Sequence, residues 1–133
     1  YRGIRRTIGE QLTESAATIP HVTHHDVAVV RELVATRAAM NERLADRDVT
    51  LTYLPFVLKA VLAGLREYPV LNSSLDEDAG EVVYKHYYNL GVATATDAGL
   101  LVPVVEAVDE KGLVELAGEI EADLRERHEV HQR

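Results

Sequence analysis

The feature that most constrains this chain is the stretch of residues 87–105, in which two extended segments flank a polar connection marked by Gly99. The first segment is mixed and aromatic. The second, residues 100–105, is an almost continuous run of aliphatic and β-branched side chains. Such a run is typical of a strand that is buried on both faces. We therefore predict two strands joined by a turn, with the second strand inside a sheet.

The rest of the chain predicts helices and strands in an order that suits helices packed on a sheet. Apolar residues at helical spacing predict helices over residues 2–18, 31–44, 53–68 and 113–127. Alternating or β-branched residues predict extended segments over residues 21–29, 70–75 and 81–85. The last two are expected to pair as a hairpin through an acidic turn, and the apolar helix 53–68 is expected to be covered all round. The predicted class is α/β, with a mixed sheet covered by helices.

Size and composition exclude several kinds of protein. The 133 residues suffice for one compact domain and are too few for two ordinary ones. The net charge of -8 argues against binding the phosphates of nucleic acids. The chain has no cysteine, which excludes disulfides, thiolate catalysis and cysteine-based zinc sites. No apolar run approaches the roughly 20 residues of a membrane span. We therefore expect neither nucleic acid nor membrane as a partner.

Residue patterns taken alone do not specify a reaction. His24 and His25 are adjacent, so they point to opposite faces of a strand and cannot chelate together, and we predict no metal site. No serine lies in a Gly-x-Ser-x-Gly frame, and the glycines form no phosphate loop. Arg5 either holds an anion or a carboxylate or is a solvated helix residue. Spacing alone leads only to an α/β domain of unspecified function.

A series of short segments nevertheless resembles the catalytic domain of dihydrolipoamide acyltransferases, the core component of 2-oxo acid dehydrogenase complexes. In order, they are residues 3–8 (GIRRTI), 19–23 (IPHVT), 51–56 (LTYLPF), 68–74 (YPVLNSS), 84–93 (YKHYYNLGVA) and 99–105 (GLLVPVV). They extend over nearly the whole chain. The resemblance implies a coenzyme A-dependent acyltransferase fold, like that of chloramphenicol acetyltransferase. Such proteins assemble as trimers with active sites between subunits.

The resemblance also implies a reaction, in which an acyl group passes from dihydrolipoamide to coenzyme A. In the family, a histidine is the general base on the thiol and a serine or threonine hydroxyl stabilises the oxyanion. Coenzyme A and the lipoyl group are then substrates, no cofactor is held covalently, and the partners are a lipoyl domain and further copies of the chain in the cytoplasm. The substrate-binding residues implied are Arg5, Asn72, Ser74, Gly99 and Leu100.

The chain departs from the family at residues that matter for the chemistry. The Asp-His-Arg-x-x-Asp-Gly motif with the catalytic histidine and the Thr-x-Thr-Asn-x-Gly strand are both absent from the 133 residues, so no catalytic residue is assigned. Alanines at 95 and 98 replace an acidic residue and an arginine, which weakens substrate binding by this loop. The family partner of Arg5 is the aspartate of the absent motif, so Arg5 is expected to be exposed or paired elsewhere.

We interpret residues 1–133 as one partial catalytic domain, corresponding to the N-terminal half, without lipoyl or subunit-binding domains. The chain is either a fragment of an acyltransferase, inactive alone, or a truncated homologue that serves in assembly or ligand binding. An unrelated binding domain with accidental similarity is the third interpretation. Half a domain exposes apolar faces, so self-association is expected.

Overall fold

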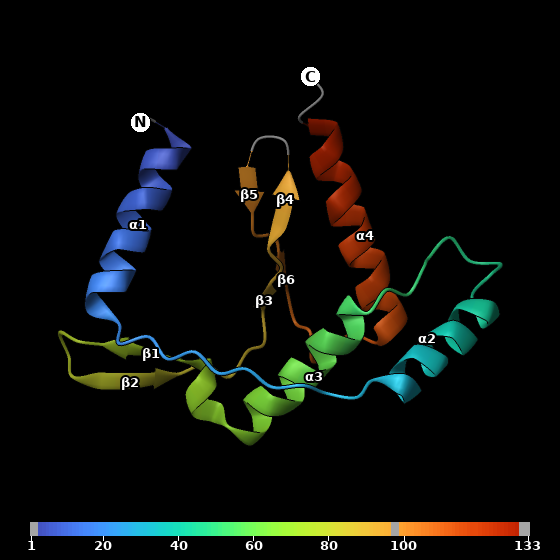
Figure 1. Cartoon of the computed structure of the whole chain (residues 1–133), viewed down its shortest axis with the longest axis horizontal. Coiled ribbons are helices and arrows are strands. Elements are labelled where there is room, and N and C mark those ends of the chain that lie inside the picture. The colour runs from blue at the N-terminus through green and yellow to red at the C-terminus, as the bar shows by residue number, and fades with distance from the viewer. Residues whose placement is uncertain (1–2, 97–98, 131–133) are drawn as a thin grey trace. The chain divides into compact units, whose positions relative to one another are not determined.

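The computed structural model describes residues 3–96 and 99–130 (Figure 1). The contacts within the chain divide it into two compact units. The first unit is Tyr1–Val30 and the second is Arg31–Arg133. One helix lies in the first unit, and the other described helices and strands lie in the second. The interpretation of residues 1–133 as one partial domain stays a prediction.

Helix α1 (Ile4–Thr18) makes up most of the first unit and confirms the first predicted helix. The residue after its last turn, Ile19, has extended backbone, with φ -99° and ψ 123°. The following residue is Pro20, and a proline disfavours helical backbone in the residue before it. Ile8 and Leu12, two apolar residues of α1, are 42% and 64% exposed. These two side chains are therefore not covered by the rest of this unit.

The segment after α1, residues 19–30, contains no strand, so the strand predicted over residues 21–29 is wrong. Val22, Val27 and Val29 are 93%, 91% and 82% exposed. A strand requires hydrogen bonds to a neighbouring strand, and none of the described strands pairs with this segment. The alternating side chains indicate a capacity for pairing that is not used within the described residues.

Three helices of the second unit confirm the remaining helix predictions. They are α2 (Arg31–Arg43), α3 (Leu54–Glu67) and α4 (Leu113–Val130). The main core lies where α3 meets α4, and its buried members are Leu58, Val105, Val108, Leu116 and Ile120. A second buried cluster joins the end of α2 to α4 through Leu44, Leu51 and Ala117. Burial of these apolar side chains is the main stabilising contribution to the unit.

The connection from α2 to α3 is fixed by a side-chain amide. Asn41 Nδ2 donates to the Leu51 carbonyl over 3.0 Å, and Asn41 Oδ1 accepts the Leu51 N–H over 2.8 Å. Both backbone groups of Leu51 thereby find partners although its side chain is fully buried, at 0% exposure. Buried backbone groups without partners are costly. Asn41 therefore allows this irregular segment to enter the core.

Helix α3 is covered on one face only, so the expectation that it is covered all round is wrong for the described residues. Pro55, Leu58 and Leu62 are buried, whereas Val57 and Val61 are 48% and 42% exposed. The composition of a helix shows which side chains are apolar. It does not show how many neighbours pack against them.

The described strands form three separate two-stranded ladders, and all of them are antiparallel rather than mixed. Strand β1 (Ser73–Asp76) follows the 3₁₀ turn η1 (Pro69–Asn72) and pairs with β2 (Glu81–Tyr84). This hairpin confirms the pairing predicted through the acidic turn. The first half of the predicted extended piece 70–75 is instead a helical turn.

The other two ladders lie end to end in one long hairpin, residues 90–105, here called the arm (Figure 1). Near its base, β3 (Leu90–Gly91) pairs with β6 (Val104–Val105). Further out, β4 (Thr94–Thr96) pairs with β5 (Gly99–Leu101). A hydrogen bond of 2.8 Å from the Val92 N–H to the Pro103 carbonyl links the ladders. The two predicted strands are confirmed.

The predicted burial of the second strand, residues 100–105, on both faces is wrong. Val105 is buried, at 1% exposure, but Leu100, Val102 and Val104 are 57%, 55% and 51% exposed. The arm reaches the core between α3 and α4 through Val105, Leu90 and Val92. Beyond the base, a two-stranded ladder has no second layer among the described residues to cover it.

Gly91 provides a test of the arm's packing. A Cβ at this position would lie 2.8 Å from Val102 Cγ1, closer than side chains tolerate. Valine is stiff at χ1, so Gly91→Ala is expected to destabilise the chain by about 1–3 kcal/mol. The free energy of unfolding is measured by urea denaturation.

Gly64→Ala in α3 is the matched control, because a Cβ there meets nothing within 4 Å. Alanine is the better helix former, so this variant is expected to gain about 0.5–1 kcal/mol. Equal stability of the Gly91→Ala variant and the unsubstituted chain would contradict the packing described.

Candidate functional site

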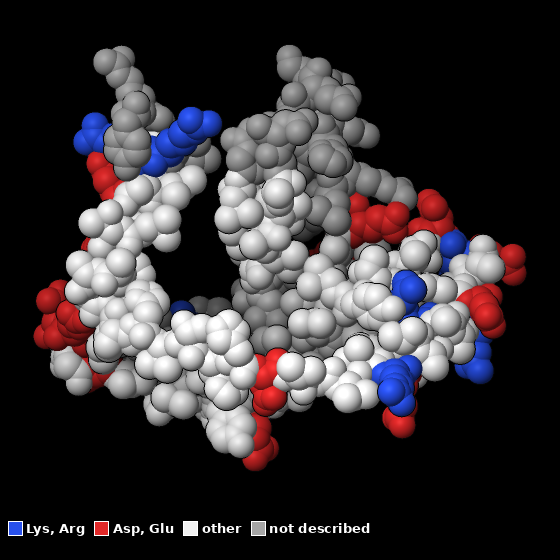
Figure 2. Space-filling model, viewed as in Figure 1, with Lys and Arg blue, Asp and Glu red and all other residues white. Residues whose placement is uncertain are grey.

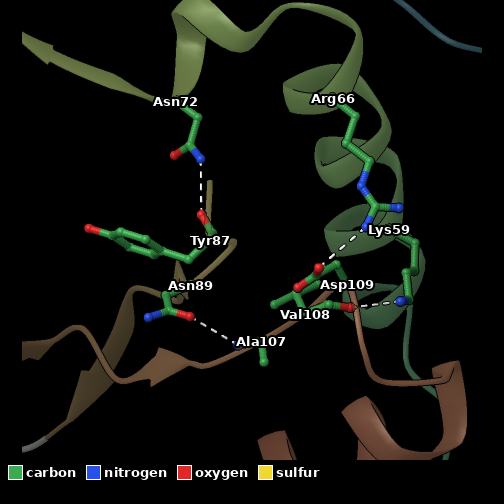
Figure 3. A network of polar contacts seen from close by, with 8 residues as sticks. All are labelled: Lys59, Arg66, Asn72, Tyr87, Asn89, Ala107, Val108 and Asp109. Atoms are coloured by element: carbon green, nitrogen blue, oxygen red, sulfur yellow. Dashed lines mark hydrogen bonds and ion pairs between the residues drawn. The ribbon is translucent and has the colours of Figure 1, made fainter. Parts of the chain in front are cut away.

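Polar contacts of the second unit gather where the two ends of the arm approach α3 (Figure 3). The Val108 N–H donates to the Tyr88 carbonyl over 2.9 Å and closes the hairpin below β3 and β6. Beside it, Asn89 Oδ1 accepts the Ala107 N–H, also over 2.9 Å. The chain segments entering and leaving the arm are thus joined by a backbone bond and a side-chain bond.

Ala107 has an uncommon backbone conformation. Its φ of 46° makes it the one non-glycine residue with positive φ in the described part of the chain. The left-handed region costs a residue with a Cβ about 1–2 kcal/mol. The hydrogen bond from the Ala107 N–H to the Asn89 side chain offsets part of that cost. This turn directs the chain from β6 toward α3.

Helix α3 contacts the same turn through two cationic side chains. Lys59 Nζ donates to the Val108 carbonyl over 2.7 Å, and this bond is partly buried. Arg66 Nη2 lies 3.3 Å from Asp109 Oδ2. The Arg66 guanidinium also lies over the Tyr88 ring, 5.3 Å from its centroid, a cation–π distance. Helix α3 therefore contacts the base of the arm at three points: the Val108 carbonyl, the Asp109 carboxylate and the Tyr88 ring.

Asn72 holds the segment that leads into the arm. Its side-chain Nδ2 donates to the carbonyls of Lys85 and Tyr87 over 2.9 and 3.0 Å. The backbone carbonyl of Asn72 accepts the Lys85 N–H over 2.9 Å. Figure 3 shows the Asn72 amide directed at the Tyr87 carbonyl. Both amide hydrogens are therefore engaged by backbone.

The sequence-predicted site residues lie in different parts of the structure. Arg5 is exposed on α1 in the first unit, as expected for an arginine without its family partner. Ser74 is exposed in β1, opposite Val83. Gly99 and Leu100 lie in β5, and Leu100 is 57% exposed. No hydrogen bond or ion pair between described residues joins these positions, so their roles in substrate binding stay predictions.

Within residues 3–96 and 99–130 no group of three or more histidine, aspartate or glutamate side chains is placed to hold a metal ion. None of the helices in this part of the chain has the length and apolar character needed to cross a membrane.

Comparison with protein families gives a match over almost the whole chain. Residues 1–131 match the family described as 2-oxoacid dehydrogenases acyltransferase (catalytic domain). The chain belongs to this family. The resemblance stated from the sequence segments is thereby confirmed.

Curated relatives in this acyltransferase family are components of the pyruvate dehydrogenase complex. The dihydrolipoyllysine-residue acetyltransferase component from Bacillus subtilis is 46% identical over 118 residues, which is 89% of this chain and 27% of the relative. The corresponding component from Staphylococcus epidermidis is 46% identical over 117 residues, 88% of this chain and 27% of the relative. The chain thus spans about a quarter of the length of the curated relatives it matches.

Solved structures in the acyltransferase family share the fold. The cubic core of the pyruvate dehydrogenase multienzyme complex matches with a TM-score of 0.86 at 38% identity, over 93% of this chain and 51% of that one. Azotobacter vinelandii dihydrolipoamide acetyltransferase matches with a TM-score of 0.87 at 37% identity, over 94% and 52%. A truncated catalytic core from Thermoplasma acidophilum matches at 0.84 and 32% identity, over 97% and 58%. The predicted α/β, acyltransferase-like fold class is confirmed.

The contacts at the base of the arm were not found from the sequence of this acyltransferase-family chain. Lys59 and the Val108 carbonyl are 49 residues apart, and Arg66 and Asp109 are 43 apart. The Lys59 bond ends on a backbone carbonyl, which leaves no mark in a residue pattern. One signal was available: Lys59 interrupts an otherwise apolar run in α3. A cation in such a run requires a partner.

Substitutions of Asn72 test whether its side-chain amide has the structural role described. Asn72→Ala removes two hydrogen bonds to backbone carbonyls, with an expected loss of about 1–3 kcal/mol in unfolding free energy. Asn72→Asp is expected to lose more, because a carboxylate then faces two carbonyl oxygens. Urea denaturation measures both.

Ser74→Ala is the control, since Ser74 is exposed and substitutions at exposed positions shift stability by about 0.5 kcal/mol or less. If Asn72→Asp were as stable as the unsubstituted chain, the amide would not be donating to the two carbonyls.

Proposed function

We propose that this chain provides part of the catalytic domain of a dihydrolipoamide acyltransferase, which transfers an acyl group between dihydrolipoamide and coenzyme A. The observation that carries the proposal is the family match over residues 1–131 together with 46% identity to an acetyltransferase component over 89% of the chain. Coenzyme A and a lipoyl group on a lipoyl domain are the proposed substrates. The cytoplasmic location follows from the same proposal.

The chemistry requires more than this chain contains. Acyl transfer needs a base to activate the thiol and a donor to the developing oxyanion. His21, His24, His25 and His86 are exposed, and the His21 ring is bonded to the Ile19 carbonyl at 2.8 Å. None of these four histidines has the buried, paired surroundings of a general base. The chain is therefore proposed to supply scaffold and substrate contacts, and to lack activity by itself.

A non-catalytic module is the second candidate function. The observation that favours it is the exposure of His21, His24, His25 and His86. A module would fold and bind partners but would stay inactive whatever segment it was joined to. The two candidates therefore differ in one measurable property: whether the chain gains acyltransferase activity when it is joined to a segment that carries the histidine motif.

Fusion to a segment of a relative tests the proposal. The chain is joined to the segment that follows the matched region in the Bacillus subtilis relative, and acetyl transfer from acetyl-coenzyme A to dihydrolipoamide is measured. The fused protein is expected to be active and the 133-residue chain inactive. A fusion whose catalytic histidine is replaced by alanine is the matched control. A fused protein that folds and assembles but transfers no acetyl would support the module instead, and activity of the chain alone would contradict the proposed lack of catalytic groups.

Self-association is proposed because apolar side chains of the second unit are exposed. Val57 and Val61 are exposed on α3. In β2, the side chains of Val82 and Val83 are each 48% exposed. By contrast α2 has no buried residue and is charged, and Figure 2 shows the charged side chains gathered over it. Exposed apolar faces of this kind mark protein interfaces.

Light scattering measures the mass of the purified chain in solution. The chain is expected to form oligomers that dissociate on dilution, because apolar surface is removed from water by a second copy. A mass that stays at that of a single chain across the concentration range would contradict self-association.

A further inference from the structure

The base of the arm carries an inference that rests on the proposed function and deepens it. Two hydrogen bonds, here called the base contacts, join the turn after β6 to its surroundings: Lys59 Nζ to the Val108 carbonyl and the Ala107 N–H to Asn89 Oδ1. Both lie at the end of the arm opposite to Gly99 and Leu100. They therefore touch none of the proposed substrate-binding residues.

The surroundings of Val108 make the contact with Lys59 important. The Val108 side chain is fully buried, at 0% exposure, within the cluster formed by α3 and α4. Removing the Lys59 ammonium would leave the Val108 carbonyl without this donor beside an apolar core, and buried carbonyls lacking a partner are strongly disfavoured. Lys59 makes no salt bridge with a described carboxylate; its bond is to the carbonyl. Lys59 thus constrains the position of the backbone at Val108 and does not neutralise a carboxylate.

The geometry of the arm turns a small change at its base into a larger one at its end. Leu100 lies five residues from Val105, which is about 16 Å along a strand at about 3.3 Å per residue. A tilt of about 5° at the base would move Leu100 by about 1.4 Å over that length. Misplacement of a reacting group by about 1 Å can slow a reaction about 100-fold. Beyond the base, Leu100 and Val102 are more than half exposed, so packing along the arm does not correct a tilt.

We propose that Lys59 and Asn89 are positioning residues that fix the direction of the arm, and thereby the place of Gly99 and Leu100, for acyl transfer. Lys59 holds the outgoing backbone against α3. Asn89 holds Ala107 in its left-handed conformation, which sets the angle at which the chain leaves β6. The Lys59 contact is partly buried and the Asn89 contact is exposed, so the larger effect is expected at Lys59.

Hydrogen exchange on the 133-residue chain tests the proposal without any activity. Lys59→Met keeps the aliphatic stem and removes the donor, and Asn89→Ala removes the acceptor. Each is expected to accelerate exchange at the Val92 and Val108 amides about fivefold to tenfold, with unchanged exchange in α3 and α4. Lys59→Arg and Asn89→Asp, which retain a donor and an acceptor, are expected to restore slow exchange.

Lys111→Met is the matched control, because Lys111 is another partly buried lysine whose partner is Glu119, at 2.5 Å. It is expected to leave exchange at Val92 and Val108 unchanged. The proposal is overturned if the arm amides exchange normally in both Lys59→Met and Asn89→Ala. It is equally overturned if exchange rises to the same extent in α3, α4 and the arm, since that indicates lost stability rather than lost positioning.

The kinetic consequence is measured in the fused protein. Lys59→Met is expected to lower kcat about tenfold or more while KM changes less, because alignment in the transition state is lost. Lys59→Arg is expected to recover most of kcat. Inactivity of the unsubstituted fusion would contradict the proposed function, while the exchange measurement would still decide whether the base contacts position the arm.

Discussion

Val105 and Val108 are buried between α3 and α4, and the position of the whole arm depends on that burial. These two side chains belong to the main core, while the strands further out expose most of their apolar surface. The core therefore holds the arm at one end only. Polar contacts with Lys59, Arg66 and Asn89 then set its direction, because hydrogen bonds are directional and apolar contacts are not.

The sequence predicted the local structure well where one element determines it. The periodicity of α2, α3 and α4 marked each helix, and the acidic turn after Asp76 marked the hairpin of β1 and β2. It failed where a second element was needed. The strand expected over residues 21–29 has no described partner, and the apolar run in the arm has no second layer to bury it. Asn72 was named from the sequence as a substrate-binding residue, and that role stays a prediction. Its bonds to the Lys85 and Tyr87 carbonyls were not foreseeable, because backbone atoms carry no sequence signal.

The chain matches the model of an acyltransferase catalytic domain and spans about half of the solved cores, 51% in one and 52% in another. Acyl transfer requires a base, an oxyanion donor and two thiol-bearing substrates to converge. The described residues hold the arm and its support, and the predicted substrate contacts at Ser74 and Leu100 lie on separate ladders. In the proposed function, the groups needed for this convergence come from other protein segments.

Reconstitution from two pieces is the measurement that tests this account most directly. The 133-residue chain is titrated with a separately produced segment that carries the family's histidine motif, and the initial rate of acetyl transfer to dihydrolipoamide is followed. The account predicts no transfer by either piece and a rate that rises with added segment until the two are equimolar. A complex that forms at that ratio and remains inactive, or transfer by the chain alone, would contradict it.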